Sequence, residues 1–210
     1  TVEARAADPA AVVNAGTNGS VCANNAAITL AGTVTGSTGG VWSGGTGTYN
    51  PNATTLSAVY TPSAAERTAG TVTLTLTSTG NGLCTAVTDQ VTYTITPAPT
   101  VNAGANQSLC GNNAVATLAG SYTVATGATW SGGAGTFSPS PNNVNATYTP
   151  TATEIANGSV TLTLTTTGNN NCTAVSDNMV LTFTPAPTAN AGADVTRCAN
   201  NASVVLGGFA

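Results

Sequence analysis

The chain of 210 residues contains no histidine and no lysine, and charged residues make up only 5% of it. Without histidine there are no imidazole general bases or histidine-ligated metals, and without lysine there is no Schiff-base or P-loop chemistry. Nucleic-acid binding needs clustered basic side chains that displace counterions, and the chain has three arginines in all. The composition therefore predicts no nucleic-acid partner.

Long hydrophobic runs are also missing. No apolar stretch approaches the roughly 18 residues of a membrane-spanning helix, so we expect no membrane span in this segment. No Cys-X-X-Cys motif and no cluster of carboxylates supplies ligands for zinc or calcium. We predict no catalytic residue, no metal, no cofactor and no enzymatic activity.

The chain is rich in threonine, with 42 residues, and its sequence contains an internal repeat. Asn14-Ala-Gly16 recurs as Asn102-Ala-Gly104 and Asn190-Ala-Gly192, with a step of 88 residues each time. More than half of the positions are identical between residues 11–98 and 99–186, and no gap is needed. This period is too long for a solenoid and is typical of a small independent domain.

The repeat predicts the domain organisation. Residues 1–10 form an N-terminal segment or the end of a preceding module, because they do not match the end of the repeat. Residues 11–98 and 99–186 form two complete copies, and residues 187–210 form the truncated start of a third. We expect the chain to be an internal piece of a longer array.

Each copy has a β pattern. In residues 71–77 threonine alternates with Val72, Leu74 and Leu76, which places these three side chains on the core face of a strand. Residues 12–21, 27–30, 41–43, 48–49, 58–61 and 91–96 give further short strands, about seven per copy with frequent turn signals. We predict an all-β fold of tandem immunoglobulin-like β-sandwich domains of about 88 residues, arranged end to end.

One helical turn is expected before the long strand. Ser63 with Glu66, and Thr151 with Glu154, fit a capping box in which hydroxyl and carboxylate each satisfy a free backbone N–H. This gives both glutamates a structural role.

The two tryptophans allow two interpretations. Trp42 and Trp130 lie on the expected third strand, where a tryptophan fills the core of an immunoglobulin-like sandwich, and Tyr60 and Tyr148 are predicted to join them. The alternative is an exposed platform on which sugars stack, favoured by the Ser-Gly-Gly that follows each tryptophan.

The cysteines Cys22, Cys84, Cys110, Cys172 and Cys198 indicate an oxidising, extracellular setting. Sequence order favours Cys22–Cys84 and Cys110–Cys172, one bond within each domain. Topology argues against this, because in a standard sandwich the two positions lie at opposite ends, roughly 30 Å apart, whereas a disulfide tolerates about 7 Å between Cα atoms. The alternative is a staple at the junction, Cys22–Cys172, which leaves the other three for neighbours outside this segment or as thiols.

The junctions read Thr-Pro-Ala-Pro-Thr in both places. Pro97 and Pro99, and likewise Pro185 and Pro187, restrict the backbone to extended conformations, so we expect successive repeats to be held stiffly. The predicted partners are therefore the neighbouring repeats of the same chain, together with other fibres or surface glycans.

The combined motif resembles a known family. Each complete copy contains, in order, the motifs Asn-Ala-Gly, Cys-X-Asn-Asn, Trp-Ser-Gly-Gly-X-Gly-Thr, Tyr-Thr-Pro, Val-Thr-Leu-Thr-Leu-Thr and Cys-Thr-Ala-Val. This combination is similar to the tandem immunoglobulin/PKD-like repeats of giant Bacteroidota surface adhesins, of the SprB gliding-motility type. The resemblance covers about residues 11–210. It implies type IX secretion and display as a filament on the bacterial cell surface, but it transfers no adhesive residue.

Two functions follow. The first is a structural repeat of an extracellular filament or adhesin stalk, which the near-identical copies favour because a spacer needs copies and an active site does not. The alternative is that each repeat is itself a glycan- or protein-binding adhesive module.

Overall fold

The computed structural model describes residues 9–209; Arg5 and most of the predicted N-terminal segment 1–10 lie outside the described residues. The chain forms two compact units. Of the described residues, the first contains 9–101, 122–127 and 166–175, and the second contains 102–121, 128–165 and 176–209.

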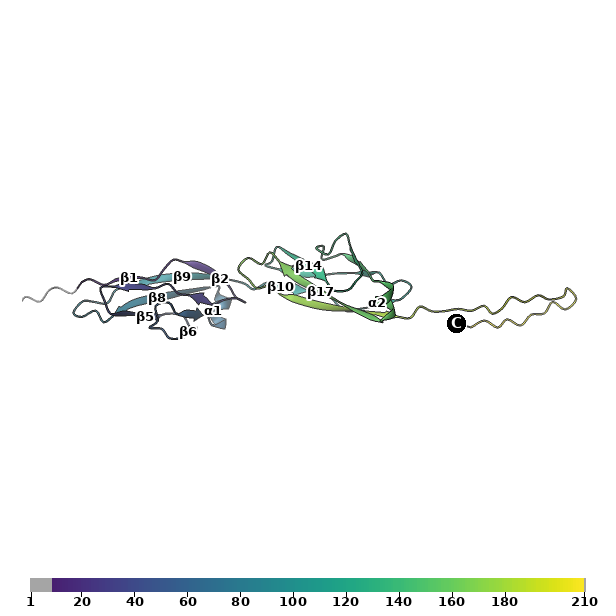
Figure 1. Ribbon diagram of the computed structural model, residues 1–210, viewed down its shortest axis with the longest axis horizontal. Helices are drawn as coiled ribbons and strands as arrows, with labels where there is room; N and C mark the ends of the chain where they lie inside the picture. The colour runs from purple at the N-terminus through teal and green to yellow at the C-terminus, as the bar shows by residue number, and fades with distance from the viewer. Residues whose placement is uncertain (1–8, 210) are drawn as a thin grey trace, which may run out of the picture. The chain divides into compact units, whose positions relative to one another are not determined.

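The first copy of the repeat contains nine short strands and one helical turn (Figure 1). They are β1 (Val12–Asn14), β2 (Gly19–Cys22), β3 (Ile28–Thr29), β4 (Thr33–Thr35), β5 (Gly39–Ser43), β6 (Thr48–Asn50), β7 (Val59–Thr61), α1 (Ala64–Ala69), β8 (Thr71–Thr79) and β9 (Thr88–Thr96).

These strands form two main sheets. One has the order β2-β9-β8-β5, the other has the order β3-β7-β6, and β1 pairs with β4 in a small third sheet. All pairs are antiparallel except β2 with β9, which run parallel and set Cys22 opposite Thr96. Side chains from both main sheets meet in one core, which is the arrangement of an immunoglobulin-like β-sandwich.

The second copy repeats this pattern. Its elements are β10 (Thr100–Asn102), β11 (Gln107–Cys110), β12 (Ala116–Thr117), β13 (Ser121–Thr123), β14 (Gly127–Ser131), β15 (Thr136–Ser138), β16 (Thr147–Thr149), α2 (Ala152–Ala156), β17 (Ser159–Thr167) and β18 (Ser176–Thr184). The sheet orders β11-β18-β17-β14 and β12-β16-β15 match those of the first copy strand for strand.

Residues 187–209 form no such sandwich. Their pairing consists of one bridge between Asn190 and Phe209. Leu30 and Leu118 are each 1% exposed in the two complete copies, but the corresponding Leu206 is 87% exposed. Among residues 187–209 no paired strands cover this leucine as they cover Leu30 and Leu118.

The strand count differs from the expected seven because the opening strand is broken and one strand was not anticipated. The chain turns between β1 and β2, where Asn14 Oδ1 accepts a hydrogen bond from Gly16 N at 2.7 Å and Gly16 has a φ of 93°, a conformation that favours glycine. The additional strand β4 is only three residues long, with the sequence Thr-Val-Thr. It forms because it pairs with β1, a contact that cannot be predicted from three residues.

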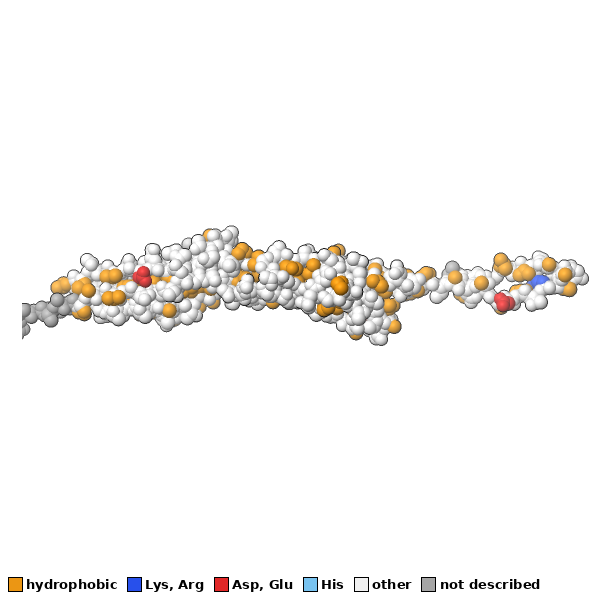
Figure 2. All heavy atoms as spheres, turned by 90° about the horizontal axis from the view of Figure 1, so that it is seen from above, with side chains coloured by type: hydrophobic (Ala, Val, Ile, Leu, Met, Phe, Trp, Pro, Cys, Tyr) orange, Lys and Arg blue, Asp and Glu red, His pale blue; other side chains and the backbone are white. Residues whose placement is uncertain are grey.

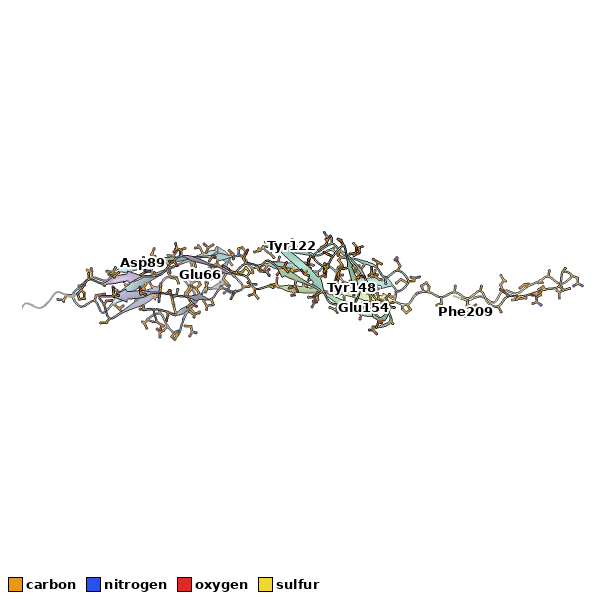
Figure 3. The ribbon with its side chains drawn as sticks, turned by 45° about the horizontal axis from the view of Figure 1, so that its top comes forward. Glu66, Asp89, Tyr122, Tyr148, Glu154 and Phe209 are labelled. Atoms are coloured by element: carbon orange, nitrogen blue, oxygen red, sulfur yellow. A yellow bond between two sulfur atoms is a disulfide. The ribbon has the colours of Figure 1, made fainter. Side chains whose placement is uncertain are left out.

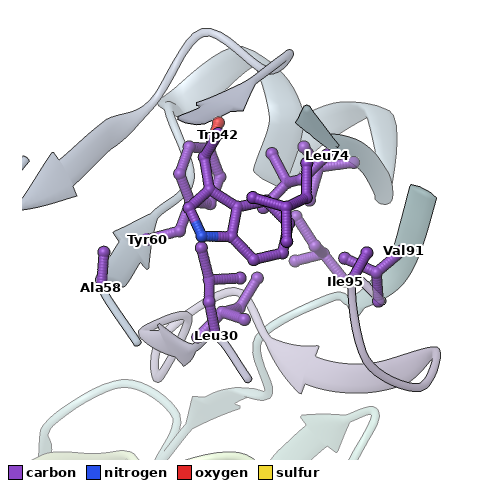
Figure 4. Packing of buried hydrophobic residues seen from close by; sticks show 11 residues of the cluster. Leu30, Trp42, Ala58, Tyr60, Leu74, Val91 and Ile95 are labelled. Atoms are coloured by element: carbon purple, nitrogen blue, oxygen red, sulfur yellow. The ribbon is translucent and has the colours of Figure 1, made fainter. Parts of the chain in front are cut away.

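Alternation along β8 builds the core. Val72, Leu74 and Leu76 are at most 4% exposed, while the intervening threonines lie on the other face. Trp42 of β5 pairs with Leu76 in the same sheet, Tyr60 of β7 lies in the opposing sheet, and both rings are buried. The Trp42 indole Nε1 donates a hydrogen bond to the Leu56 carbonyl at 3.1 Å. Figure 4 shows the indole among these side chains.

We predict that Trp42→Ala lowers the free energy of unfolding by about 3–5 kcal/mol, because it leaves a cavity in the core. The matched control is Tyr122→Ala, which removes an aromatic ring that is 36% exposed, and we expect it to cost about 0.5 kcal/mol. Denaturant titration of both variants measures the difference. Equal stability of the two would contradict the assignment of Trp42 to the core.

Candidate functional site

The chain contains one disulfide bond, between Cys22 and Cys172, among its described residues 9–209. Their Cα atoms lie 4.9 Å apart, although 150 positions separate them in the sequence. Cys172 belongs to the second sequence copy, but its loop, residues 166–175, groups with the first structural unit. The structure therefore contains the pairing that the sequence left as the alternative.

The favoured pairings Cys22–Cys84 and Cys110–Cys172 are wrong. Because β2 runs parallel to β9, Cys22 lies beside Thr96 at the end of β9, whereas Cys84 precedes the first residue of that strand. A strand of nine residues separates the two positions by roughly 25–30 Å. The same parallel pairing sets Cys110 opposite Thr184 at the end of β18, while Cys172 precedes β18.

Side-chain amides surround the disulfide. Asn24 and Thr173 form a reciprocal pair: Asn24 Nδ2 donates to the Thr173 carbonyl at 2.9 Å, and Thr173 N donates to Asn24 Oδ1 at 3.1 Å. Asn171 Nδ2 donates to the carbonyl and hydroxyl oxygens of Ser20, both at 3.3 Å. Hydrogen bonds thus fix the loop on both sides of Cys172.

These amide residues were missed by the sequence reasoning. A signal was available, since Cys22-Ala-Asn24-Asn25 recurs as Cys110-Gly-Asn112-Asn113 and as Cys198-Ala-Asn-Asn at the next step of 88. Cys110, with its side chain partly exposed, and Cys198, which is exposed, are both thiols.

A second cluster of polar groups surrounds the buried carboxylate of Glu66 at the start of α1. The Ser63 hydroxyl accepts from Glu66 N, and Glu66 Oε2 accepts from Ser63 N at 2.7 Å, which forms a capping box. Glu66 Oε1 also accepts from Thr46 N at 2.7 Å, and the Tyr60 hydroxyl lies within hydrogen-bond distance of both carboxylate oxygens, at 2.8 and 2.9 Å. Donors on both oxygens compensate for the burial of the carboxylate.

The glycines of the Trp-Ser-Gly-Gly-X-Gly motif make room for this cluster. A Cβ at Gly45, whose φ is 69°, would lie 2.0 Å from the Tyr60 hydroxyl oxygen, and a Cβ at Gly47 would lie 2.7 Å from it. The backbone N–H of Gly47 donates to that hydroxyl at 2.8 Å. The glycines of the motif that suggested a sugar platform therefore allow the backbone to approach a buried tyrosine closely.

The second copy contains the same cluster. Thr151 and Glu154 form the capping box of α2, the Tyr148 hydroxyl donates to Glu154 Oε1 at 2.7 Å, and Gly135 N donates to that hydroxyl. Figure 3 shows Tyr148 beside Glu154.

The cluster shifts the pKa values of its members in opposite directions. Burial raises the pKa of Tyr148 to about 12, and the hydrogen bond to Glu154 adds to this shift. Burial alone would raise the pKa of Glu66, but the hydrogen bonds from Ser63, Thr46 and Tyr60 outweigh it and hold the pKa below its ordinary value. The pKa of Glu154 is lowered in the same way, so both glutamates are ionised acceptors at neutral pH.

Trp42 and Trp130 are each 2% exposed, so the alternative interpretation of them as glycan contacts is wrong. A stacking platform needs an exposed ring face, and these rings lie inside the two cores.

The Asn-Ala-Gly motif and the aspartate of the last strand form a third structural contact. Asp89 Oδ2 accepts from Ala15 N at 2.8 Å, and Asp177 Oδ2 accepts from Ala103 N at the same distance.

Residues 9–209 contain no group of three or more His, Cys, Asp or Glu side chains that could hold a metal. In the same range, no helix has the length and apolar character to cross a bilayer.

The predicted junction prolines are placed at the strand ends. Pro97 and Pro99 connect β9 to β10, with Pro97 exposed and Pro99 buried, while Pro185 and Pro187 follow β18 and are both exposed.

Few Asp, Glu or Arg side chains are visible on the face shown in Figure 2. On the outer face of β8 and β9, opposed threonines bond to each other, as Thr73 Oγ1 and Thr92 Oγ1 do at 2.9 Å. This face offers hydroxyl groups where most soluble domains offer charges.

No known protein-family profile matches the chain, and no curated protein matches it. Among solved structures it is similar to Sidekick-1 immunoglobulin domains 1–4, with 14% identity, a TM-score of 0.42 and coverage of 83% of this chain and 48% of that one. It is also similar to Drosophila N-cadherin EC1-4, with 11% identity, a TM-score of 0.40 and coverage of 80% of this chain and 48% of that one. For human protocadherin-24 EC1-2 the identity is 12%, the TM-score is 0.40, and the coverage is 86% of this chain and 100% of that one. The chain thus spans about half the length of the Sidekick-1 and N-cadherin structures. Because these TM-scores are low, we assign the fold from the strand pairing of this chain itself.

We predict that acid removes the stabilisation supplied by the glutamates. Because their pKa values are lower in the folded state, their contribution is complete above the unfolded value of about 4.3 and is lost as the pH falls through the folded value. In the double variant Glu66→Gln/Glu154→Gln, each new amide NH₂ faces N–H and O–H groups that also donate and therefore cannot accept its hydrogen bonds. We expect the variant to be less stable than the parent by about 2 kcal/mol per site at pH 7.

Thermal unfolding of parent and variant across pH 2–7 checks this. The difference in melting temperature should be constant above about pH 5 and should shrink below about pH 4. A difference that does not depend on pH would contradict the role of the carboxylates.

Proposed function

We propose that this chain is a structural segment of an extracellular filament or adhesin stalk displayed on a bacterial cell surface. The observation that carries the proposal is the disulfide Cys22–Cys172 in a chain whose sandwich is repeated with the same internal contacts. A disulfide of this kind persists in an oxidising compartment outside the cytosol. The resemblance to Bacteroidota surface adhesins supports the bacterial surface and type IX secretion.

The covalent connectivity suits a segment under tension. A force applied to both ends of the chain passes through residues up to Cys22, across the disulfide, and onward from Cys172. The intervening residues, which include strands β3 to β17, are bypassed by this path. The strands of the first sandwich from β3 onward are thereby shielded from the applied load, while β1 and β2 carry it.

The surface composition supports the same function. With three arginines and no lysine, the chain offers trypsin-like proteases almost no cleavage sites. A hydroxyl-rich surface keeps its character as ionic strength changes, whereas interactions between exposed charges are screened by salt.

The alternative, an adhesive module in every repeat, loses its specific support. The aromatic rings proposed as sugar platforms are buried, and the glycine-rich loops after them hold the Tyr60–Glu66 cluster and its counterpart. A glycan array probed with the chain would test this alternative, and specific binding would favour it over a purely structural role.

We predict that single-molecule stretching between the two termini shows a large difference between oxidised and reduced chain. Reduction should release about 500 Å of additional contour length, from the 150-residue separation of the bonded cysteines at roughly 3.4 Å per residue. Cys22→Ser should behave like the reduced chain under both conditions, and Cys198→Ser, which removes a thiol outside the bond, should behave like the parent.

The location is tested on cells of the source organism. Antibodies against the chain should decorate thin filaments on unpermeabilised cells in electron micrographs, with label spaced regularly along each filament. Label that appears only after permeabilisation would refute the proposed extracellular stalk.

A further inference from the structure

The Cys22 end of the first copy receives a loop of the second. Asn24 bonds to the backbone of Thr173, and Asn171 donates to Ser20. The sulfurs of Cys22 and Cys172 each lie 3.7 Å from the Pro97 carbonyl oxygen. With the loop in place, Cys22 is 0% exposed.

The same receiving groups recur at the end of the second copy. Ser20, Cys22, Asn24 and Asn25 correspond, with a step of 88, to residues of identical type: Ser108, Cys110, Asn112 and Asn113.

The local backbone is also the same. Ala23 N donates to the Thr96 carbonyl at 2.9 Å, and its counterpart Gly111 N donates to the Thr184 carbonyl at 2.8 Å. A bridge joins Cys110 to Asn113 as one joins Cys22 to Asn25. The second copy therefore presents the geometry that holds a loop in the first.

At this second end, however, hollows are open where the first end carries a loop. One, of about 210 Å³, is lined by Asn112, Asn113 and Pro150, and another, of about 370 Å³, is lined by Thr184 and Pro185. Gly111 and Ile155 line both. The Cys110 thiol is partly exposed, and its sulfur lies 3.9 Å from the Pro185 carbonyl oxygen.

We propose that the Cys110 end is a docking site for the cysteine-bearing loop of a further copy of this repeat, and that a disulfide to Cys110 then fixes the loop. The occupant has the sequence Gly-Asn-X-X-Cys-Thr-Ala-Val, which residues 168–175 carry, as do residues 80–87 of the first copy. The proposal goes beyond the stalk function, because it concerns recognition between repeats wherever the protein is found.

The chemistry is a two-electron oxidation by a small-molecule disulfide such as glutathione disulfide. The Cys110 thiolate attacks the oxidant and releases one glutathione thiolate, and the loop cysteine then displaces the second glutathione from Cys110. In the net reaction one sulfur–sulfur bond forms, one breaks, and two thiols of glutathione are the products.

An extended chain tests the proposal. Appending a copy of residues 123–186 after Ala210 completes the third repeat in register, because position 123 lies 88 residues before position 211. After equilibration in a glutathione redox buffer, non-reducing peptide mapping should find Cys110 bonded to the cysteine of the appended loop, and Cys22 still bonded to Cys172.

A matched variant separates recognition from mere proximity. Asn112→Ala removes the amide whose counterpart forms the reciprocal pair in the first copy, and it should lower the equilibrium ratio of bonded to reduced Cys110 about tenfold. Asn145→Ala, which removes an exposed amide that lines neither hollow, should leave the ratio unchanged.

A second measurement does not depend on folding of the appended repeat. The intact chain of 210 residues is mixed with a peptide of residues 166–177 whose cysteine is activated as a thiopyridyl disulfide. It should label Cys110 about tenfold faster than a peptide with alanine in place of Asn171, whose side-chain amide makes the contacts to Ser20 in the first copy, while Cys198 reacts equally with both. Equal rates at Cys110, or an unbonded Cys110 in an extended chain whose third repeat is folded, would overturn the proposal.

Discussion

The parallel pairing of β2 with β9 is the constraint on which the chemistry of this chain depends. It sets Cys22 beside Thr96, at the end of the last strand of the sandwich, and so separates Cys22 from Cys84 by the length of that strand. A cysteine in this position can bond only to a group that reaches the same end. The loop with Cys172 does so, and the amides of Asn24 and Asn171 hold it there.

Inside each sandwich, one buried carboxylate connects several elements through hydrogen bonds. Glu66 joins the start of α1, the turn after β5 and the tyrosine of β7 through hydrogen bonds of 2.7–2.9 Å. Its counterpart Glu154 does the same with Tyr148 and the backbone of Ala134. The cost of burying an ionised group is offset because each carboxylate oxygen has donors, and the glycine-rich motif lets those donors approach.

The threonine-rich strands alternate between a hydroxyl-bearing outer face and an apolar inner face. β-branched side chains fit the pleated outer face, and their hydroxyls bond across strands, as Thr73 and Thr92 do. The leucines and valines between them fill the core. A surface of this kind needs few charges, which is why a chain with 5% charged residues forms two ordered sandwiches.

The sequence by itself determined the fold class, the core and the helical turn. Strict alternation at Val72, Leu74 and Leu76 admits only a strand with one buried face, and the spacing of Ser63 and Glu66 is that of a capping box; these are local properties that the period of the backbone dictates. The disulfide and the role of the glycines that follow Trp42 were decided only by the tertiary structure. Cys22 and Cys172 are 150 residues apart, so their meeting depends on the direction of β2 relative to β9 and on the placement of residues 166–175, and neither is encoded in the neighbourhood of either cysteine. Likewise, the glycines beside Trp42 become intelligible only once Tyr60 and Glu66 are seen to occupy the space that a side chain there would need.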